Sequence, residues 1–205
     1  MSKRIVVAVT GASGAVYAKR LLGCLADAAV DIHLIISQHG RELIAEELGI
    51  TDPSSEALVG AARAKIIIEH LYESVGALPA SGSFLTDGMI ICPCSSNTLA
   101  EVAGGMASNL ISRAAAVHLK ERRRLVLLTR EMPVSQIDLA NMLRISQAGG
   151  IICPASPGFY MRPTAIGDLV DFVVGKLCDL VGVEHSLNTR WDPGPHREED
   201  DSSPQ

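Results

Sequence analysis

The stretch Ile5–Ala15 reads IVVAVTGASGA and carries the two signals on which the fold prediction rests. Its first five residues, Ile5–Val9, are all apolar, and the lack of polar alternation indicates a strand that is buried on both faces. The glycine-containing run that follows, Thr10–Gly14, allows a tight turn into a helix. A buried strand followed directly by a helix is the repeating unit of a parallel α/β sheet.

The same alternation of strand and helix continues along the chain. Further apolar runs predict strands over 32–36, 89–92, 125–128 and 150–153, and segments of helical composition cover 14–29, 38–48, 95–121, 135–147 and 166–181. Residues 50–64 are expected to form a loop leading into a helix, and residues 77–88 a loop of small side chains. We therefore predict one α/β domain over residues 1–191, built on a doubly wound parallel sheet, and a disordered acidic tail over 192–205.

Composition and charge narrow the class of protein. The 205 residues include 18 Lys and Arg against 23 Asp and Glu, a net charge of −5, and only 3% are aromatic, which disfavours nucleic-acid binding. No apolar run reaches the ~20 residues that a membrane span needs. Lys3-Arg4 and the short run after it lack the cleavage region of a signal peptide. The five cysteines are odd in number and have apolar neighbours, which predicts reduced thiols in a cytoplasmic protein.

Small polar residues follow three of the predicted strands, where ligands of parallel sheets bind. Gly11, Ala12 and Ser13 follow the first strand, Ser37 follows the second, and the run Cys92–Thr98 (CPCSSNT) ends the strand 89–92. Hydroxyl groups and helix starts at three strand ends suit a phosphate and a planar cofactor. They favour FMN over a dinucleotide, because neither a G-x-G-x-x-G set nor a Walker lysine is present. The alternative is that each hydroxyl only caps the helix that follows it.

Residues 109–133 concentrate cations in an otherwise acidic chain. Arg113 and Lys120 are seven residues apart and share one face of the predicted helix. The run Arg122–Arg124 fits a solvated helix end. Arg130 and Glu131 instead follow the buried strand 125–128, where a charge pair indicates a binding site or an interface ion pair.

Two cysteines near the third exit do not predict a metal site. Cys92 and Cys94 form one C-x-C pair without a second pair of ligands, which is a weak signal. Beyond the last strand, Tyr160 could donate a hydrogen bond to a phosphate, and Lys176 on the following helix could supply positive charge.

Seven strings in this order resemble the flavin prenyltransferase family, the UbiX-type enzymes. They are TGASGA at 10–15, PASGS at 79–83, CPCSSNTL at 92–99, RAAAVHLKERR at 113–123, LVLLTREMP at 125–133, PASPGFY at 154–160 and DLVDFVV at 168–174. Arg190-Trp191 also fits, so the similarity covers about residues 4–191.

The resemblance implies a flavodoxin-like (Rossmann-like) fold and a metal-independent reaction. Family members join the prenyl group of dimethylallyl phosphate to N5 and C6 of reduced FMN. The product, prenylated FMN, is the cofactor of a UbiD-type decarboxylase. The family commonly assembles as a dodecamer, which implies a homo-oligomer here.

The resemblance also implies roles for individual residues. The positions that match FMN contacts are Gly11, Ala12, Ser13, Ser37, Ser95, Ser96, Asn97, Thr98 and Arg130. Those that match the prenyl-phosphate region are Ser81, Arg113, Lys120, Tyr160 and Lys176. The expected catalytic residues are Ser13, Glu47, Lys120 and Glu131. Lys176 stands where many relatives have arginine, which keeps the charge but loses the bidentate fork.

Three rival functions are weighed against this interpretation. A flavin-dependent cysteine decarboxylase would carry an Asn-x-x-Met-Trp element, and the only tryptophan here is Trp191. A non-catalytic accessory subunit of a decarboxylase would not need Lys120, Glu131 and Tyr160. A direct aromatic acid decarboxylase would need decarboxylation machinery that the sequence does not show.

Overall fold

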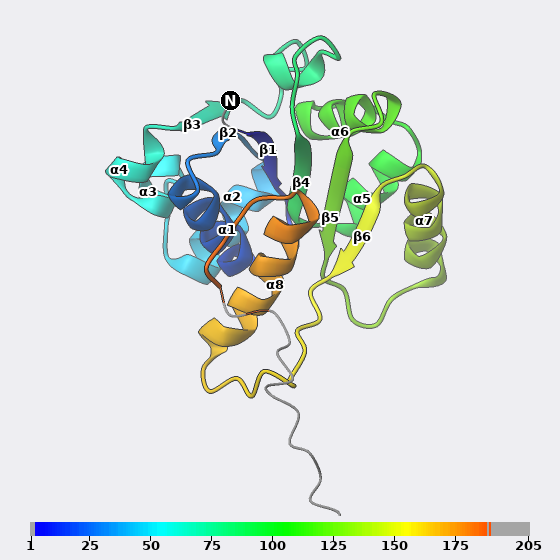
Figure 1. The fold of residues 1–205 in the computed structure, drawn as a ribbon. Helices are drawn as coiled ribbons and strands as arrows, with labels where there is room; N and C mark the ends of the chain where they lie inside the picture. Colours follow the sequence, from blue (N-terminus) through cyan, green and yellow to red (C-terminus); the bar gives the residue numbers. More distant parts are fainter. Residues whose placement is uncertain (1–2, 188, 190–205) are drawn as a thin grey trace, which may run out of the picture.

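The computed structural model describes residues 3–187 and 189, and its centre is a six-stranded sheet (Figure 1). The strand order is β3-β2-β1-β4-β5-β6, and every neighbouring pair is parallel. The strands are β1 Arg4–Val9, β2 Asp31–Ile36, β3 Ile67–His70, β4 Gly88–Cys94, β5 Arg124–Thr129 and β6 Ile151–Pro154. The predicted parallel α/β sheet is confirmed.

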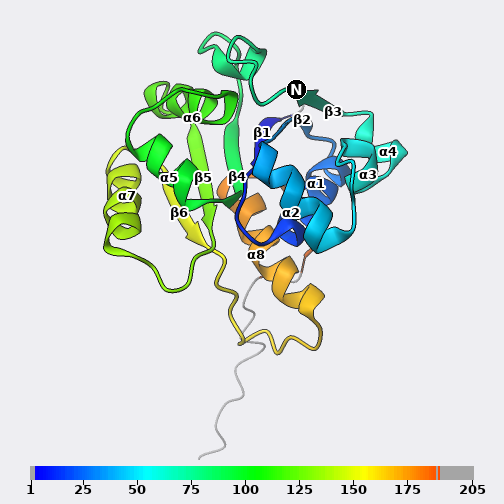
Figure 2. The same cartoon turned by 180° about the vertical axis from the view of Figure 1, so that it is seen from behind.

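Helices cover both faces of the sheet, as a doubly wound fold requires (Figures 1 and 2). Ile5 and Val7 of β1 belong to one buried cluster, and Val6 and Ala8, which alternate with them, belong to the other. The first cluster includes α1 Ala15–Asp27, α2 Gln38–Leu48, α3 Ser55–Val59 and α8 Ile166–Leu180. The second includes α5 Ser96–Ala103, α6 Leu110–Lys120 and α7 Gln136–Gln147.

The strand order reverses direction between β1 and β4. From β1 the chain builds outward through β2 to β3, then returns to add β4 on the other side of β1. Ile5 of β1 lies opposite both Ile32 of β2 and Gly88 of β4, so the three strands start level. Their carboxyl ends therefore meet at one edge, where such sheets bind ligands. We call this end of the sheet, where the strands finish, the carboxyl edge. The opposite end, where the strands begin, is called the amino edge.

Strand β3 was not predicted from the sequence. It has only four residues, IIEH, and is an outermost strand of the sheet, where Glu69 is exposed. A strand that is half polar lacks the continuous apolar run by which the other strands are recognised.

The predicted helix over 95–121 is wrong, because the structure has two helices there. Helix α5 ends at Gly104-Gly105, and Gly105 adopts a left-handed φ of 68°. Helix α6 then begins with a new cap, in which Asn109 accepts the N–H of Ser112 at 2.9 Å.

The region 50–64 also contains more helix than the single one predicted. It forms α3 and the short α4 Ala61–Ala64, which are separated at Gly60 with a φ of 84°. The expected loop over 77–88 contains one 3-10 turn, Leu78–Ala80. Within the described residues, no helix is long and apolar enough to cross a bilayer. The predicted tail, 192–205, lies outside the described residues.

Candidate active site

Thr10 joins the carboxyl ends of β1 and β4. Its Oγ1 donates to the carbonyl of Pro93 at 2.8 Å and accepts the N–H of Ser95 at 2.8 Å, and its own N–H donates to the same Pro93 carbonyl. The side chain is buried, so these bonds are shielded from water. The carboxyl ends of β1 and β4, both of which the sequence predicted to carry cofactor-binding residues, are therefore fixed beside each other.

Two glycines bring the start of α2 against the exit of β1. A Cβ on Gly11 would lie 2.5 Å from Cβ of His39, and one on Gly40 would lie 2.6 Å from the carbonyl oxygen of Val9. Neither position has room for a side chain. The turn Gly11–Ser13 and the amino end of α2 thus form one surface, on which Gly11 and Ser13 are exposed.

The capping alternative holds at two of the three strand exits. Ser37 accepts the N–H of Gly40 at 3.1 Å and caps α2, and Ser95 accepts the N–H of Thr98 at 3.3 Å and caps α5. Ser13 is different, because the N-cap of α1 is Gly14, which has no side chain to bond the helix. Capping therefore does not account for Ser13.

Glu47 takes the place of a side-chain cap at the start of α1. Its carboxylate accepts the N–H of Gly14 at 3.0 Å and that of Ala15 at 2.7 Å. A carboxylate at a helix N-terminus is favoured by the helix dipole. The structure thus places Glu47, which the sequence proposed for proton transfer, directly behind the Gly11–Ser13 turn.

Arg130 and Glu131 lie at the carboxyl end of β5, as predicted. Arg130 has a buried Nε with no hydrogen-bond partner in the described part of the chain. Glu131 is exposed, and its Oε2 accepts the hydroxyl of Ser96 at 3.3 Å. Ser96 also helps to lower the pKa of Asp138 at the start of α7, where the hydroxyl of Ser135 is the larger cause. The Ser96 hydroxyl therefore lies near two carboxylates and, with its single proton, donates to one of them at a time.

Tyr160 and Lys176 lie along one side of α8. The ring of Tyr160 packs edge-to-face on Phe172, with 5.7 Å between ring centroids. Lys176 follows Phe172 by one helical turn, so both side chains lie on the same face of α8. Tyr160 and Lys176 are both exposed.

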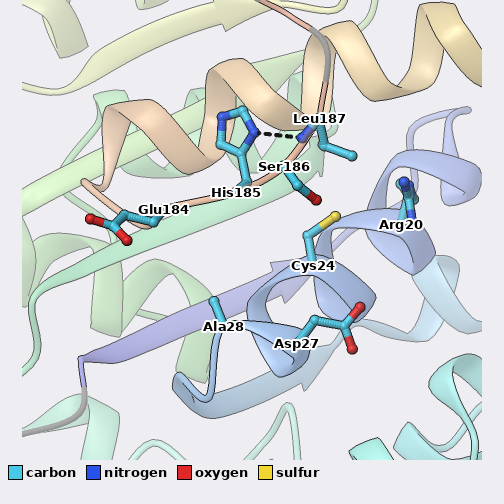
Figure 3. A pocket seen from close by; sticks show the side chains of 8 residues that line it. All are labelled: Arg20, Cys24, Asp27, Ala28, Glu184, His185, Ser186 and Leu187. Atoms are coloured by element: carbon cyan, nitrogen blue, oxygen red, sulfur yellow. Dashed lines mark hydrogen bonds between the residues drawn. The ribbon is translucent and has the colours of Figure 1, made fainter.

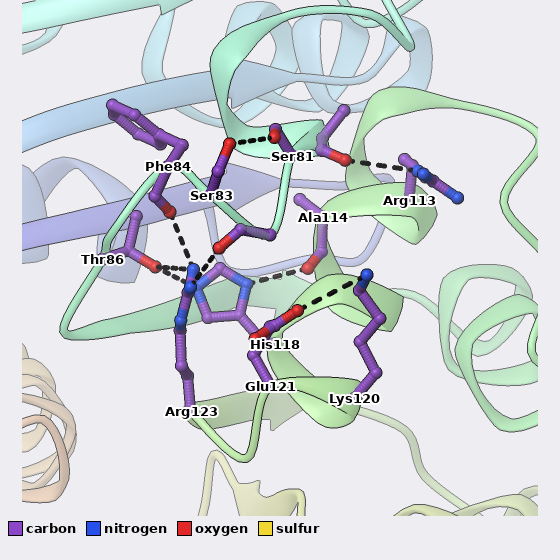
Figure 4. A network of polar contacts seen from close by, with 12 residues as sticks. Ser81, Ser83, Phe84, Thr86, Arg113, Ala114, His118, Lys120, Glu121 and Arg123 are labelled. Atoms are coloured by element: carbon purple, nitrogen blue, oxygen red, sulfur yellow. Dashed lines mark hydrogen bonds and ion pairs between the residues drawn. The ribbon is translucent and has the colours of Figure 1, made fainter.

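The remaining prenyl-phosphate residues, Ser81, Arg113 and Lys120, lie at the amino edge (Figures 1 and 4). Arg113 donates to the carbonyl of Ala80, and Lys120 ends α6 just before β5 begins. The six residues of β5 separate this edge from Arg130 by about 20 Å. One chain therefore does not gather all the predicted residues into one site.

The interpretation of Arg122–Arg124 as a solvated helix end is wrong for two of the three residues. Arg123 is half-buried and donates to the carbonyls of Gly82 and Phe84. Arg124 is the first residue of β5 and donates to the carbonyl of Leu180 at 2.9 Å. Of the three, only Arg122 is exposed and makes no side-chain hydrogen bond to a backbone carbonyl within the described part of the chain.

The cysteines at the β4 exit belong to the core. Cys92 and Cys94 are buried as free thiols, and burial raises the pKa of both. A thiol with a raised pKa is a poor nucleophile and a poor metal ligand at neutral pH. Among the described residues, no group of three or more His, Cys, Asp and Glu side chains is arranged to hold a metal ion.

A pocket of about 210 Å³ lies away from this edge, between α1 and residues 184–187 (Figure 3). It is smaller than a typical ligand pocket, and Arg20, Asp27 and His185 of its lining already have ion-pair partners. Arg20 binds Asp171 at 2.6 Å, Asp27 binds Arg63 at 2.7 Å, and His185 lies 3.4 Å from Asp179. The carboxyl edge is therefore the better candidate for a flavin.

The carboxyl edge has features that fit FMN. It combines an exposed glycine turn, the starts of α2 and α5, and the Nε of Arg130, which has no partner among the residues the structure describes and suits a phosphate or a flavin carbonyl. Sequence reasoning assigned no role to Thr10 or Asp138. A threonine directly after a buried strand is a signal for Thr10, but the influence of Ser96 on the pKa of Asp138 links separate helices and has no local signal.

The chain matches the Flavoprotein family model over residues 1–178. It is 46% identical over 190 residues to the flavin prenyltransferase UbiX of Thermoplasma acidophilum, covering 92% of this chain and 99% of that one. The crystal structure of AnUbiX (PadA1) with FMN and dimethylallyl pyrophosphate superposes with a TM-score of 0.85 at 41% identity, covering 94% and 98%. The dodecameric FMN-dependent UbiX-like decarboxylase of Escherichia coli O157:H7 superposes with a TM-score of 0.84 at 41% sequence identity. The match covers 92% of this chain and 99% of that one.

More distant structures share the fold alone. The FMN-dependent cysteine decarboxylase TvaF has a TM-score of 0.57 at 13% identity. The rival function as a cysteine decarboxylase thus has no support beyond the fold. The chain belongs to the UbiX flavin prenyltransferases, a family of flavoproteins.

Proposed function

We propose that the chain transfers the dimethylallyl group of dimethylallyl phosphate to reduced FMN and releases inorganic phosphate. The observation that carries the proposal is the carboxyl edge, where the Gly11–Ser13 turn and the start of α2 lie on one side of the strand reversal and Arg130 lies at the same end of the sheet on the other side. The similarity to a relative whose structure contains FMN and dimethylallyl pyrophosphate supports it.

The FMN-binding part of the site is proposed to be the carboxyl edge. Reduced FMN supplies the nitrogen and carbon, N5 and C6, that form the new bonds. The residues proposed to hold it are Gly11, Ala12, Ser13, Ser37, Ser95, Ser96, Asn97, Thr98 and Arg130. In this arrangement Ser37 and Ser95 act by fixing the helix starts they cap, whereas Ser13 does not cap α1 and Nε of Arg130 has no hydrogen-bond partner among the described residues.

The prenyl phosphate needs positive charge where phosphate departs. Breaking the bond between the allylic carbon and oxygen leaves a delocalised cation and a phosphate anion, so donors placed at the phosphate lower the barrier. Lys120, Tyr160 and Lys176 are proposed to supply these donors, with Ser81 and Arg113 beside them.

The separation of these groups implies a site shared between subunits. Ser81, Arg113 and Lys120 lie at the amino edge, so we infer that a neighbouring copy brings them to the carboxyl edge of this chain. The dodecameric relative from E. coli supports such an assembly. Several large apolar side chains are also exposed: Leu71 68%, Leu85 72%, Met132 86%, Ile137 74% and Leu143 58%. A homo-oligomer, with a dodecamer as the expected form, would cover such side chains.

Two carboxylates are proposed to move protons. Glu131 at the β5 exit would share a proton with the departing phosphate and later accept the proton lost from flavin C6. Glu47 is the second candidate, because it lies behind Ser13 with its carboxylate held by Gly14 and Ala15.

The product, prenylated FMN, would pass to a UbiD-type decarboxylase. We place the protein in the cytoplasm, since all five cysteines are free thiols and a reducing compartment keeps them so.

The deciding experiment is an anaerobic incubation of the protein with reduced FMN and dimethylallyl phosphate, followed by mass spectrometry of the flavin. We expect the flavin mass to increase by one prenyl group with release of phosphate. An unchanged flavin under conditions where FMN binds would overturn the proposal and leave a flavin carrier.

A further inference from the structure

The segment Ser81–Asp87, just before β4, alternates between exposed and half-buried residues. Ser81, Ser83, Leu85 and Asp87 are exposed, and Gly82, Phe84 and Thr86 between them are half-buried. Residues 81–84 form a turn, in which the N–H of Phe84 donates to the carbonyl of Ser81 at 3.2 Å, and residues 85–87 lead on to β4. We call the half-buried residues the inward side of the segment and the exposed ones its outward side. Gly82 and Thr86 lie against the end of α6 and His118, whereas the ring of Phe84 packs edge-to-face on His33 of β2.

Arg123 binds each residue of the inward side (Figure 4). It donates to the carbonyls of Gly82 and Phe84, the latter at 2.7 Å, and to Oγ1 of Thr86 at 3.5 Å. A planar guanidinium has donors in a fixed fork and can hold several acceptors at once, whereas lysine has a single point of charge. One side chain thus sets the path of the whole segment.

His118 fixes the inward end of the same network. Its Nδ1 donates to the carbonyl of Ala114 at 2.8 Å, so Nε2 accepts the hydroxyl of Thr86 at 2.8 Å. Burial lowers the pKa of His118, which keeps the imidazole neutral and able to accept. Thr86 is thereby held between α6 and Arg123.

The outward side presents a pair of hydroxyls, and an ion pair lies beside the glycine between them. Ser81 Oγ and Ser83 Oγ lie 2.8 Å apart, and Gly82 between them packs against the end of α6. A Cβ on Gly82 would meet Oε1 of Glu121 first and would lie 3.4 Å from Nζ of Lys120, so the Lys120–Glu121 pair lies beside the glycine that separates the two serines. Lys120 is 60% exposed, and its only ion pair found in the described residues is with Glu121 at 3.4 Å.

We propose that Arg123 is a positioning residue that holds Ser81 and Ser83 beside Lys120 as one phosphate-binding surface. The proposal rests on the proposed function, in which Ser81 and Lys120 serve the prenyl phosphate. It adds Ser83 as a direct phosphate contact. It also gives Arg123 and His118 a role in substrate affinity through Gly82, Phe84 and Thr86.

The test compares Arg123→Lys with Arg124→Lys in the full-length protein. Arg124 also donates to a backbone carbonyl but at α8, away from the segment, so its variant controls for a lost arginine fork. Three quantities are measured for each: KM and kcat for dimethylallyl phosphate, Kd of this compound by calorimetry without FMN, and Kd of FMN.

For Arg123→Lys we expect KM and Kd of dimethylallyl phosphate to rise by at least about 10-fold. FMN affinity, kcat and oligomer size should stay within about two-fold of wild type, as should all values for Arg124→Lys. Unchanged KM and Kd, or an equal loss of FMN affinity, would overturn the proposal. If Arg123→Lys does not fold, Thr86→Val is judged by the same criteria, because it removes only the hydroxyl between His118 and Arg123.

Two further variants complete the test. Ser83→Ala leaves the inward network intact and should raise Kd of dimethylallyl phosphate by about three-fold or more, which a purely structural role of the segment would not do. Lys120→Ala reports on the proposed function itself. If Lys120→Ala raises KM and Arg123→Lys does not, the positioning role alone fails. If neither does, the amino edge has no part in the reaction.

Discussion

The carboxylate of Glu47 accepts the backbone N–H of Ala15 at 2.7 Å, so a residue of α2 closes the first turn of α1. The contact joins α2, whose start is part of the carboxyl edge, to the first turn of α1. It also puts a negative charge at the start of α1, which leaves the starts of α2 and α5 and Arg130 as the groups of this edge that are suited to a phosphate.

Glu47→Gln separates the two roles of this residue. The amide can still accept one N–H but lacks the charge, so we expect stability to fall by about 1 kcal/mol and prenylation to slow by about 10²-fold. Urea unfolding and the mass of the flavin product measure the two effects. The adjacent Glu46→Gln, also on the exposed side of α2, should change neither. Lower stability with normal turnover would reduce Glu47 to a helix cap.

Arg130→Ala should weaken FMN binding. The buried Nε has no partner in the described part of the chain, and a charge-assisted hydrogen bond contributes about 1.5–3 kcal/mol. We therefore expect Kd of FMN to rise by about 10- to 100-fold in a fluorescence titration. Arg144→Ala, on the exposed side of α7, is the control and should bind FMN normally. Equal affinities of Arg130→Ala and wild type would remove Arg130 from the site.

The sequence predicted the sheet well because the central strands are long apolar runs. It missed β3 because Glu69 and His70 make up half of that strand. The break between α5 and α6 was visible as Gly104-Gly105, but the apolar and small residues on either side fit one long helix. The Glu47–Ala15 contact could not be predicted, since it joins positions 32 residues apart.

The candidate site was predicted as one set of residues, although its members lie at two edges. The resemblance grouped Lys120 with Tyr160 because both serve one ligand in the family, not because they share an edge of one chain. Chain order alone does place Lys120 at the amino edge, since it precedes β5 by four residues. Arg123 was missed because a run of three arginines after a helix is usually solvated, and only the fold of 81–87 gives it acceptors.

Glu131→Gln should slow prenylation by at least about 10²-fold while the protein still folds and binds FMN. The substitution keeps the shape of the side chain and its contact with Ser96 but removes the proton acceptor. Single-turnover formation of prenylated FMN, followed by mass, measures the effect. Asp138→Asn changes the other carboxylate that Ser96 serves and should stay within a few-fold of wild type. Near-normal turnover of Glu131→Gln would limit Glu131 to its hydrogen bond with Ser96.

Acid should destabilise the protein through His33. This side chain is 1% exposed, and its Nδ1 lies 2.7 Å from Nε2 of His70. Burial, then the charges of His70 and Arg4, lower the pKa of His33 to about 4, and only Asp31 opposes them. The unfolded state therefore binds a proton first. The stability present above about pH 6.5 is lost as pH falls toward 4, at up to about 1.4 kcal/mol per pH unit.

His33→Asn should flatten this dependence, because its amide can still bond His70 but does not titrate. The measurement is urea unfolding at pH 7, 6 and 5 at one protein concentration. A smaller slope should remain, since burial also lowers the pKa of His70 and His118. Identical slopes for the variant and wild type would show that His33 does not contribute.

Mixing two impaired variants should restore activity if the site is shared between subunits, at FMN and dimethylallyl phosphate concentrations too low to saturate either variant. Lys120→Ala disables the amino edge of a chain and Arg130→Ala its carboxyl edge, and the length of β5 keeps the two apart. In co-expressed oligomers that assemble at random, roughly a quarter of the sites would pair an intact amino edge with an intact carboxyl edge. We therefore expect prenylation well above that of either variant alone.

Mixing Lys120→Ala with Arg113→Ala is the matched control. Both changes lie at the amino edge, so every site in this mixture has an altered amino edge. Recovery in the first mixture and not in the second would require that Lys120 acts on the flavin site of another copy. An absence of recovery in the first mixture, with mixed oligomers confirmed by their tags, would contradict the shared site.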